Sequence, residues 1–126
     1  MERYRLTKVE GLTPGEVAQF IEDEGKERLV VLDVREPWEW ESDTGHVKDS
    51  FLIPMNQIPE SLDKIRRLSS KRIGVICNSG ERSYYVCRYL QSNGIQDVFN
   101  IEGGIIKWNL SGLEVEYGAA KPEQTL

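Results

Sequence analysis

Two short apolar segments, residues 29–34 and 72–77, constrain the fold of this chain more than any other feature. Both are rich in β-branched residues, which is typical of parallel strands buried on both faces of a sheet. Weaker strands are expected at residues 50–53 and 97–101, with helical patterns between the strands. Strands that alternate with helices pair in parallel through right-handed crossovers. We therefore expect an α/β fold with a mainly parallel central sheet of about five strands and helices on both faces.

The first expected helix has the clearest start signal. Thr13 is a good N-cap, Pro14 suits the first helical position, and Glu16 completes a capping box. Gly25 is placed to end this helix. Further helical segments are expected at residues 36–42, at residues 60–68 and through Trp108. Another helix is expected at residues 82–91, with Tyr85, Val86, Tyr89 and Leu90 on one face. Residues 45–47 are expected to form a turn.

Length and composition are those of a globular protein with one domain. The chain has 126 residues, enough to bury a core without disulfides, and its 39% hydrophobic and 29% charged residues are an ordinary balance. We expect one domain over residues 1–117 and a flexible tail over residues 118–126. Residues 1–8 lack the apolar segment of a secretory signal, and no run is long enough to span a bilayer. The sequence therefore favours a cytoplasmic protein without a membrane partner.

Charge and ligand counts argue against several kinds of partner. The formal net charge is −5 and no basic stripe is present, which disfavours nucleic acid. The single histidine, His46, and the two cysteines, Cys77 and Cys87, fit no metal-binding spacing, so we expect neither a metal nor another cofactor. Cys87 is expected to pack in the core. The acidic segment at residues 39–43 is expected to be an exposed turn without a catalytic role.

Cys77 stands where a ligand site belongs in such a fold. It ends the strongest expected strand, and sites in open α/β sheets lie outside the carboxyl ends of strands. The next residues, Asn78-Ser79-Gly80-Glu81, include a glycine that can adopt left-handed backbone angles, so successive N–H groups can converge on one point. The helix expected from Arg82 adds unpaired N–H groups and its positive dipole end. Together they favour a thiolate and should lower the pKa of Cys77.

Each side chain of this loop also has a simpler interpretation. Cys77 could be a small buried hydrophobic residue, although its position before a glycine-containing loop favours a reactive thiol. Arg82 either binds an anionic donor through a bidentate contact or points outward and pins the loop to a carboxylate. Ser79 and Ser83 could donate hydrogen bonds to sulfur, and Ser83 could instead cap the helix. Glu81 opposes any anion in the loop unless it faces solvent.

The loop resembles the active-site loop of rhodanese-like domains. Residues 77–83, CNSGERS, are similar to the pattern Cys-x-x-Gly-x-Arg-Ser of that family. Three further motifs follow the order of the family, and four ordered motifs are more specific than one. They are residues 32–36 (LDVRE) with Trp38 and Glu39, residues 45–47 (GHV) with Ile53 and Pro54, and residues 101–105 (IEGGI) with Trp108, so that the resemblance spans roughly residues 5–115.

The resemblance implies a sulfurtransferase. A cysteine of this family attacks the outer sulfur of a donor such as thiosulfate, releases sulfite and keeps the sulfur as a persulfide. A thiol or cyanide then removes that sulfur. In this chain the resemblance gives the carrier role to Cys77, with the amides of residues 78–83 holding the terminal sulfur. It also implies that Asp33 braces the loop and that Arg35 lies at the rim of the site.

Two other functions stay open. The chain could be a sulfur carrier that docks a cysteine desulfurase or an acceptor protein and turns over small donors poorly. It could also be a phosphatase or arsenate reductase, but those relatives place five residues between cysteine and arginine, whereas four lie between Cys77 and Arg82. The tighter loop suits one sulfur better than a tetrahedral oxyanion. The sequence therefore favours sulfur transfer.

Overall fold

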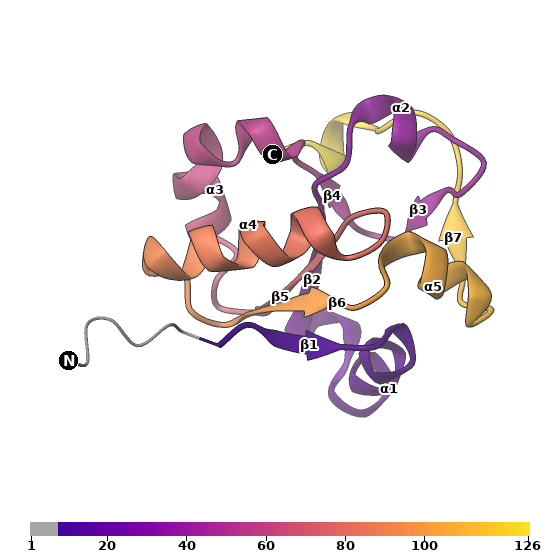
Figure 1. The fold of residues 1–126 in the computed structure, drawn as a ribbon, viewed down its shortest axis with the longest axis horizontal. Coiled ribbons are helices and arrows are strands. Elements are labelled where there is room, and N and C mark those ends of the chain that lie inside the picture. The colour runs from indigo at the N-terminus through magenta and orange to yellow at the C-terminus, as the bar shows by residue number, and fades with distance from the viewer. Residues whose placement is uncertain (1–7) are drawn as a thin grey trace.

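The computed structural model describes residues 8–126, so the expected domain start at residue 1 lies outside the described residues. Its centre is a sheet of five parallel strands in the order β1-β6-β5-β2-β4 (Figure 1). This arrangement confirms the predicted α/β fold and its parallel central sheet. The strands are β1 (Glu10–Leu12), β2 (Leu29–Asp33), β4 (Phe51–Leu52), β5 (Arg72–Ile76) and β6 (Val98–Ile101).

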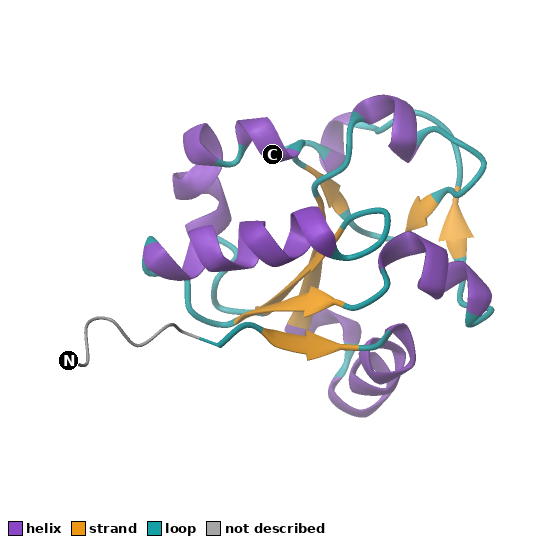
Figure 2. Cartoon of the chain, viewed as in Figure 1, coloured by secondary structure: helices purple, strands orange, loops and turns teal. Residues whose placement is uncertain are grey.

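Helices cover both faces of this sheet (Figure 2). Side chains of α3 and α4 belong to one hydrophobic cluster and those of α1 and α5 to a second. The α-helices are α1 (Pro14–Glu24), α2 (Pro37–Trp40), α3 (Leu62–Arg66), α4 (Glu81–Ser92) and α5 (Gly104–Leu110). Short 3-10 helices lie between them: η2 (Lys26–Arg28), η3 (Met55–Gln57), η4 (Pro59–Ser61) and, near the C-terminus, η5 (Pro122–Gln124).

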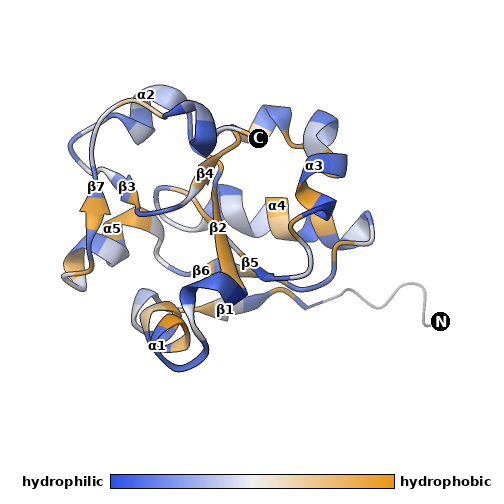
Figure 3. Cartoon of the chain, turned by 180° about the vertical axis from the view of Figure 1, so that it is seen from behind, coloured by the Kyte–Doolittle hydropathy of each residue, from blue (hydrophilic) through white to orange (hydrophobic). Residues whose placement is uncertain are grey.

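β2 supplies side chains to both halves of the core. All five of its residues are buried. Val30 and Leu32 belong to the cluster that includes α3 and α4, whereas Leu29 and Val31 belong to the one that includes α1 and α5. Successive residues of a strand point to opposite faces, so a continuous apolar run is needed where both faces are covered. Figure 3 shows β2 as hydrophobic beside helices of mixed hydropathy.

The predicted start of α1 is confirmed. The Thr13 hydroxyl oxygen accepts a hydrogen bond from the Glu16 amide at 3.1 Å, and the Glu16 carboxylate accepts one from the Thr13 amide at 2.8 Å. These contacts satisfy two amides that the helix itself leaves unpaired. Gly25 follows the last residue of the helix, as expected, with a φ of 97° and its N–H donating to the Ile21 carbonyl at 2.9 Å.

Of residues 45–47, expected to form a turn, His46 and Val47 belong instead to a second, small sheet. β3 (His46–Val47) pairs antiparallel with β7 (Val115–Glu116), which the sequence did not predict. β1 was also missed. Strands of two or three residues carry too little alternation to be detected along the chain. They form because distant segments of the folded chain bring partners beside them.

The apolar face predicted for α4 is buried only in part, at Val86 and Leu90. Tyr85 is 60% exposed and Tyr89 is 38% exposed. The prediction grouped the largest apolar side chains, whereas the buried stripe follows helical spacing from the first turn. Cys87 lies in that stripe, as expected of a core residue. The buried residues of α4 are Ser83, Val86, Cys87, Leu90 and Gln91.

Residues 118–126 lie against the domain, which differs from the flexible tail expected from their composition. η5 begins with a capping box in which the Gln124 side-chain oxygen accepts a hydrogen bond from the Lys121 amide at 2.8 Å. Gln124 is buried, and Leu126 packs against the cluster that includes α3 and α4. Composition cannot reveal such contacts, because they depend on partners elsewhere in the chain.

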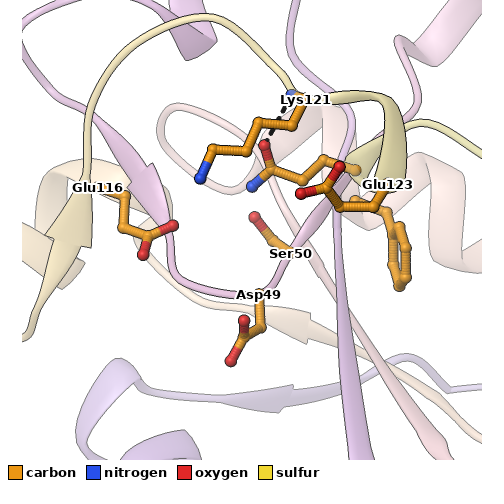
Figure 4. Close-up of a pocket in the computed structure, with 7 residues that line it drawn as sticks. Asp49, Ser50, Glu116, Lys121 and Glu123 are labelled. Carbon is orange, nitrogen blue, oxygen red and sulfur yellow. Dashed lines mark hydrogen bonds between the residues drawn. The ribbon is translucent and has the colours of Figure 1, made fainter.

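A polar pocket lies between this segment and the turn before β4 (Figure 4). Lys121 and Glu123 line it from the C-terminal segment, and Asp49 and Ser50 line it from the turn. None of its lining residues belongs to residues 77–83. The pocket is therefore separate from the loop that the sequence singles out.

A buried ion pair joins the end of β2 to the segment after it. Arg35 Nη2 lies 2.7 Å from Asp33 Oδ2, and both side chains are fully buried. The Arg35 guanidinium also donates to the carbonyl oxygens of Glu39 and Gly45 and to the Thr44 hydroxyl. These bonds tie α2 and the start of β3 to the sheet. The charge is thus paired and hydrogen-bonded, as a buried charge must be.

We expect Asp33→Asn to lower the free energy of unfolding by about 3–5 kcal/mol, because it leaves the buried Arg35 guanidinium without a counter-charge. Chemical denaturation measures this loss. Asp63→Asn is the matched control, since Asp63 pairs with Arg66 at the surface, with the two side chains 88% and 46% exposed. The control should unfold as the parent protein does. Equal stability of the two variants would contradict a structural role for the Asp33 carboxylate.

A second prediction concerns the packing of β5 on β6. A methyl group on Gly74 would lie 2.6 Å from the Phe99 ring, which is fully buried and has little room to move. We expect Gly74→Ala to destabilise the protein by about 1–3 kcal/mol. Gly15→Ala in α1 is the control, because its methyl group would meet only the Thr13 hydroxyl at 3.9 Å. Thermal melting of both variants tests the difference, and a stable Gly74→Ala protein would refute it.

Candidate active site

The candidate site begins where β5 ends. Cys77 follows the last residue of β5, and α4 starts four residues later at Glu81. Gly80 is the N-cap of α4 and has a left-handed conformation, with a φ of 104°. This conformation, which glycine adopts without strain, turns the chain back over the cysteine. The structure therefore forms the strand-loop-helix arrangement that the sequence predicts around Cys77.

The N-terminus of α5 holds this loop from the side. The Ile105 amide donates to the Cys77 carbonyl at 2.9 Å, and the Ile106 amide donates to the Asn78 carbonyl at 3.2 Å. Gly104 permits this approach, because a methyl group there would lie 2.4 Å from the Asn78 carbonyl oxygen. Gly104, the first residue of α5, thus has a steric role: it lets two backbone segments approach closely.

Backbone amides converge on the sulfur of Cys77. Its Sγ accepts hydrogen bonds from the amides of Gly80 at 3.1 Å and Ser83 at 3.4 Å, and it lies 3.3 Å from the Ser83 hydroxyl. Burial alone raises the pKa of Cys77, but the Ser83 hydroxyl and the amides of Ser83, Gly80 and Ser79 outweigh burial, so the pKa lies below its ordinary value. This is the direction expected from the sequence.

The two cysteines lie in opposite electrostatic environments. Cys77 is 1% exposed, yet it is surrounded by donors that stabilise a negative sulfur. Cys87 packs in the core, where burial and the nearby Cys77 raise its pKa to about 12. Of the two thiols, only that of Cys77 lies in an environment that favours its ionised form.

Asn100 on β6 belongs to this site, and sequence reasoning missed it. Its side-chain oxygen accepts a hydrogen bond from the Ser83 hydroxyl at 2.6 Å, and its side-chain nitrogen donates to the Gly80 carbonyl at 3.0 Å. Asn100 is 9% exposed. A polar residue inside a strand that is otherwise apolar was the available signal, since buried amides are retained where they have partners.

Of the two roles expected for Arg82, binding an anionic donor or pinning the loop to a carboxylate, the structure shows the second. Its guanidinium makes a bidentate ion pair with Glu39 on α2, at 2.7 and 2.8 Å, and so pins the loop to a carboxylate. The Arg82 side chain is 35% exposed and that of Glu39 is 13% exposed. The hydrogen bond from Arg82 lowers the pKa of Glu39 despite partial burial. Residues 39–43 are therefore not simply an exposed acidic turn, because Glu39 holds the active-site loop.

The other predicted residues lie in different places. Arg35 is fully buried in its pair with Asp33, so its expected place at the rim was wrong. The Asp33 carboxylate accepts its hydrogen bonds from Arg35 and not from the loop, so Asp33 supports the site through the ion pair. Ser79 and Glu81 are exposed on the outside of the loop, and their side chains are 3.5 Å apart. The exposure of Glu81 reduces its repulsion of an anion.

Within residues 8–126, no group of three or more His, Cys, Asp or Glu side chains is arranged to hold a metal ion. No helix in that part of the chain is long and apolar enough to cross a membrane.

Known proteins are similar to this chain in sequence and in fold. A sulfurtransferase from Allochromatium vinosum is 35% identical over 89 residues, which are 71% of this chain and 79% of that protein. A putative sulfurtransferase from Bacillus subtilis is 38% identical over 85 residues, which are 68% of this chain and 78% of that protein. The solved structure of a rhodanese-related protein from Thermoplasma volcanium matches with a TM-score of 0.74 at 28% identity, covering 86% of this chain and 99% of the other.

The family model for the rhodanese-like domain matches residues 13–111. That span includes the cysteine loop, the Asp33–Arg35 pair, Glu39, Asn100 and the glycine pair before α5. The agreement of sequence, topology and loop geometry identifies the chain: it belongs to the rhodanese-like domain family.

Proposed function

We propose that this protein is a sulfurtransferase that carries sulfane sulfur as a persulfide on Cys77. The observation that carries the proposal is the convergence of the Gly80 and Ser83 amides on Cys77 Sγ. Preorganised N–H donors stabilise negative charge without needing to move during the reaction. They favour the thiolate that attacks, and amides of the same loop, residues 78–83, are available to a terminal persulfide sulfur.

The reaction needs no general base once Cys77 is ionised. The thiolate attacks the outer sulfur of the donor and forms a new S–S bond, while the donor's own bond to that sulfur breaks and its electron pair leaves with the sulfite or thiolate. A thiol or cyanide then attacks the terminal sulfur of the persulfide, and Cys77 departs as a thiolate. A lowered pKa serves both steps, because a stabilised thiolate is also a better leaving group.

The geometry disfavours the phosphatase and arsenate reductase alternatives. Their oxyanion would need the arginine of the loop, but the Arg82 guanidinium is engaged by both oxygens of Glu39. The loop between Cys77 and Arg82 is also one residue short of the pattern of those relatives. A single sulfur needs neither a wider loop nor a cation, so sulfur transfer fits the site better.

The same ion pair favours a persulfide over thiosulfate as the donor. Thiosulfate carries two negative charges, and an arginine neutralised by Glu39 attracts it weakly. Exposed Glu81 adds a further repulsion. We therefore propose that the donor is a persulfide, either a small molecule or one carried by a protein such as a desulfurase. The proposed acceptor is a thiol. A cytoplasmic location would suit the free thiols of Cys77 and Cys87.

The central test is a mass measurement on the purified protein. Incubation with thiosulfate or with a small-molecule persulfide should add the mass of one sulfur, and cyanide should remove it. Cys77→Ser should not gain mass, whereas Cys87→Ser, the matched control, should gain it as the parent protein does. Sulfur on Cys87, or none with either donor, would refute the proposed function. Gain from the persulfide alone would favour the carrier form of the proposal.

Donor choice has its own test at Glu39. Glu39→Gln removes the charge that neutralises Arg82, so we expect the rate of sulfuration by thiosulfate to rise by about threefold to tenfold and to fall again with added salt. The rate with a persulfide that carries a single negative charge should rise less. Glu41→Gln, an exposed carboxylate in the same segment, is the control and should change neither rate. A slower reaction of Glu39→Gln with thiosulfate would contradict the argument.

A further inference from the structure

The Ser83 hydroxyl lies between two groups that compete for its one hydrogen. Ser83 Oγ is 2.6 Å from the Asn100 side-chain oxygen and 3.3 Å from Cys77 Sγ. A hydroxyl donates one hydrogen bond at a time. The amide oxygen of Asn100 carries no hydrogen, so the short contact places the hydroxyl hydrogen on the Asn100 side. While Cys77 is a thiol, the hydrogen is thus withheld from the sulfur, and it reaches the thiolate only if the hydroxyl turns away from Asn100.

The orientation of Asn100 is fixed by the loop itself. Its side-chain nitrogen donates to the Gly80 carbonyl at 3.0 Å, so its oxygen must face Ser83. Ser83 is fully buried and Asn100 nearly so, which limits replacement of these bonds by water. Gly80, whose carbonyl accepts this hydrogen bond, also donates its own amide to Cys77 Sγ. Asn100 therefore contacts both residues, Gly80 and Ser83, that donate hydrogen bonds to the sulfur.

We propose that Asn100 is a positioning residue that competes with the Cys77 sulfur for the Ser83 hydroxyl hydrogen and so opposes ionisation of that sulfur. Its relevance to catalysis rests on the proposed role of Cys77 as the sulfur carrier. Its effect on the ionisation of the thiol does not depend on that role.

The two protonation states use the same atoms differently. In the thiol state Cys77 S–H donates to Ser83 Oγ, whose own hydrogen goes to the oxygen of Asn100. When the sulfur loses its proton to solvent, two unprotonated atoms, S⁻ and Oγ, face each other unless the hydroxyl turns. Once it turns to donate to the sulfur, the Asn100 oxygen loses its buried donor. An unsatisfied buried acceptor is unfavourable, so Asn100 stabilises the thiol relative to the thiolate.

The opposition of Asn100 to ionisation of Cys77 is useful in sulfur transfer. A thiolate that is stabilised too strongly is a weak nucleophile, and the best attacking thiol has a pKa near the ambient pH. The amides of Gly80 and Ser83 favour ionisation, whereas Asn100 limits the contribution of the hydroxyl. Cys77 can then act as both nucleophile and leaving group at one pH.

The charged and titratable groups around the loop differ from Asn100, because they act on the sulfur through space. They leave the hydrogen of Ser83 in place, so changes to them should shift the ionisation of Cys77 equally with and without that hydroxyl. They are Glu81, Arg82 and Cys87 on α4, Glu39 on α2, the Asp33–Arg35 pair at the end of β2, and Lys107 on α5, whose stem packs over Gly103.

The test is a double-mutant cycle read by the pH dependence of alkylation of Cys77 with iodoacetamide. Asn100→Ala should free the hydroxyl for the sulfur, so that alkylation below the midpoint pH is about threefold to tenfold faster than in the parent protein. Ser83→Ala should slow it, because the hydroxyl is lost. Adding Asn100→Ala to Ser83→Ala should change nothing further, since the hydrogen in question is gone. Cys87, with its raised pKa, stays unmodified.

Three results would overturn the proposal. They are an Asn100→Ala effect of the same sign as that of Ser83→Ala, no effect at all, or an effect that persists without the hydroxyl. The first and last would mean that Asn100 acts by holding the Gly80 carbonyl. Asn100→Leu, which fills the same space, repeats the cycle if the alanine variant melts early. Alkylation needs no sulfur donor, so its outcome is independent of whether persulfide forms.

Discussion

The site depends on one interaction: peptide N–H groups at the end of β5 point at the sulfur of Cys77. They come from Gly80, whose left-handed conformation turns the loop, and from Ser83 in the first turn of α4. Neither amide could serve the sulfur if the loop were free to move. The α5 amides that bind the carbonyls of Cys77 and Asn78 fix it, and Gly104 lets them come close enough.

The charged residues around the loop mainly have structural roles. Asp33 and Arg35 form a fully buried pair that ties α2 to the sheet, and Glu39 of α2 then holds Arg82. Two cations that would otherwise be free to bind anions are thereby engaged. The negative sulfur is stabilised chiefly by neutral dipoles, which favour one localised charge over a bulky dianion. This division links the fold to the proposed preference for a persulfide donor.

Much of the fold and the centre of the site followed from local patterns. A few neighbouring residues determine each of these features: the strands β2 and β5, the capping box of α1 and the place of Cys77 after a central strand. The two-residue strands, the buried face of α4 and the packing of residues 118–126 were not, because each depends on contacts between distant segments. Asn100 was missed for the same reason, since its partners Ser83 and Gly80 lie on another element.

By itself, the sequence determined the α/β class, the family resemblance and the candidate nucleophile, Cys77. Apolar period, glycine position and motif order are properties of the chain alone. Tertiary structure decided which of the possible partners each polar side chain has: Glu39 for Arg82, Asp33 for Arg35, and Asn100 for Ser83. Hydrogen bonds and ion pairs act over a few ångströms, and only the folded chain brings residues that are tens of positions apart within that range.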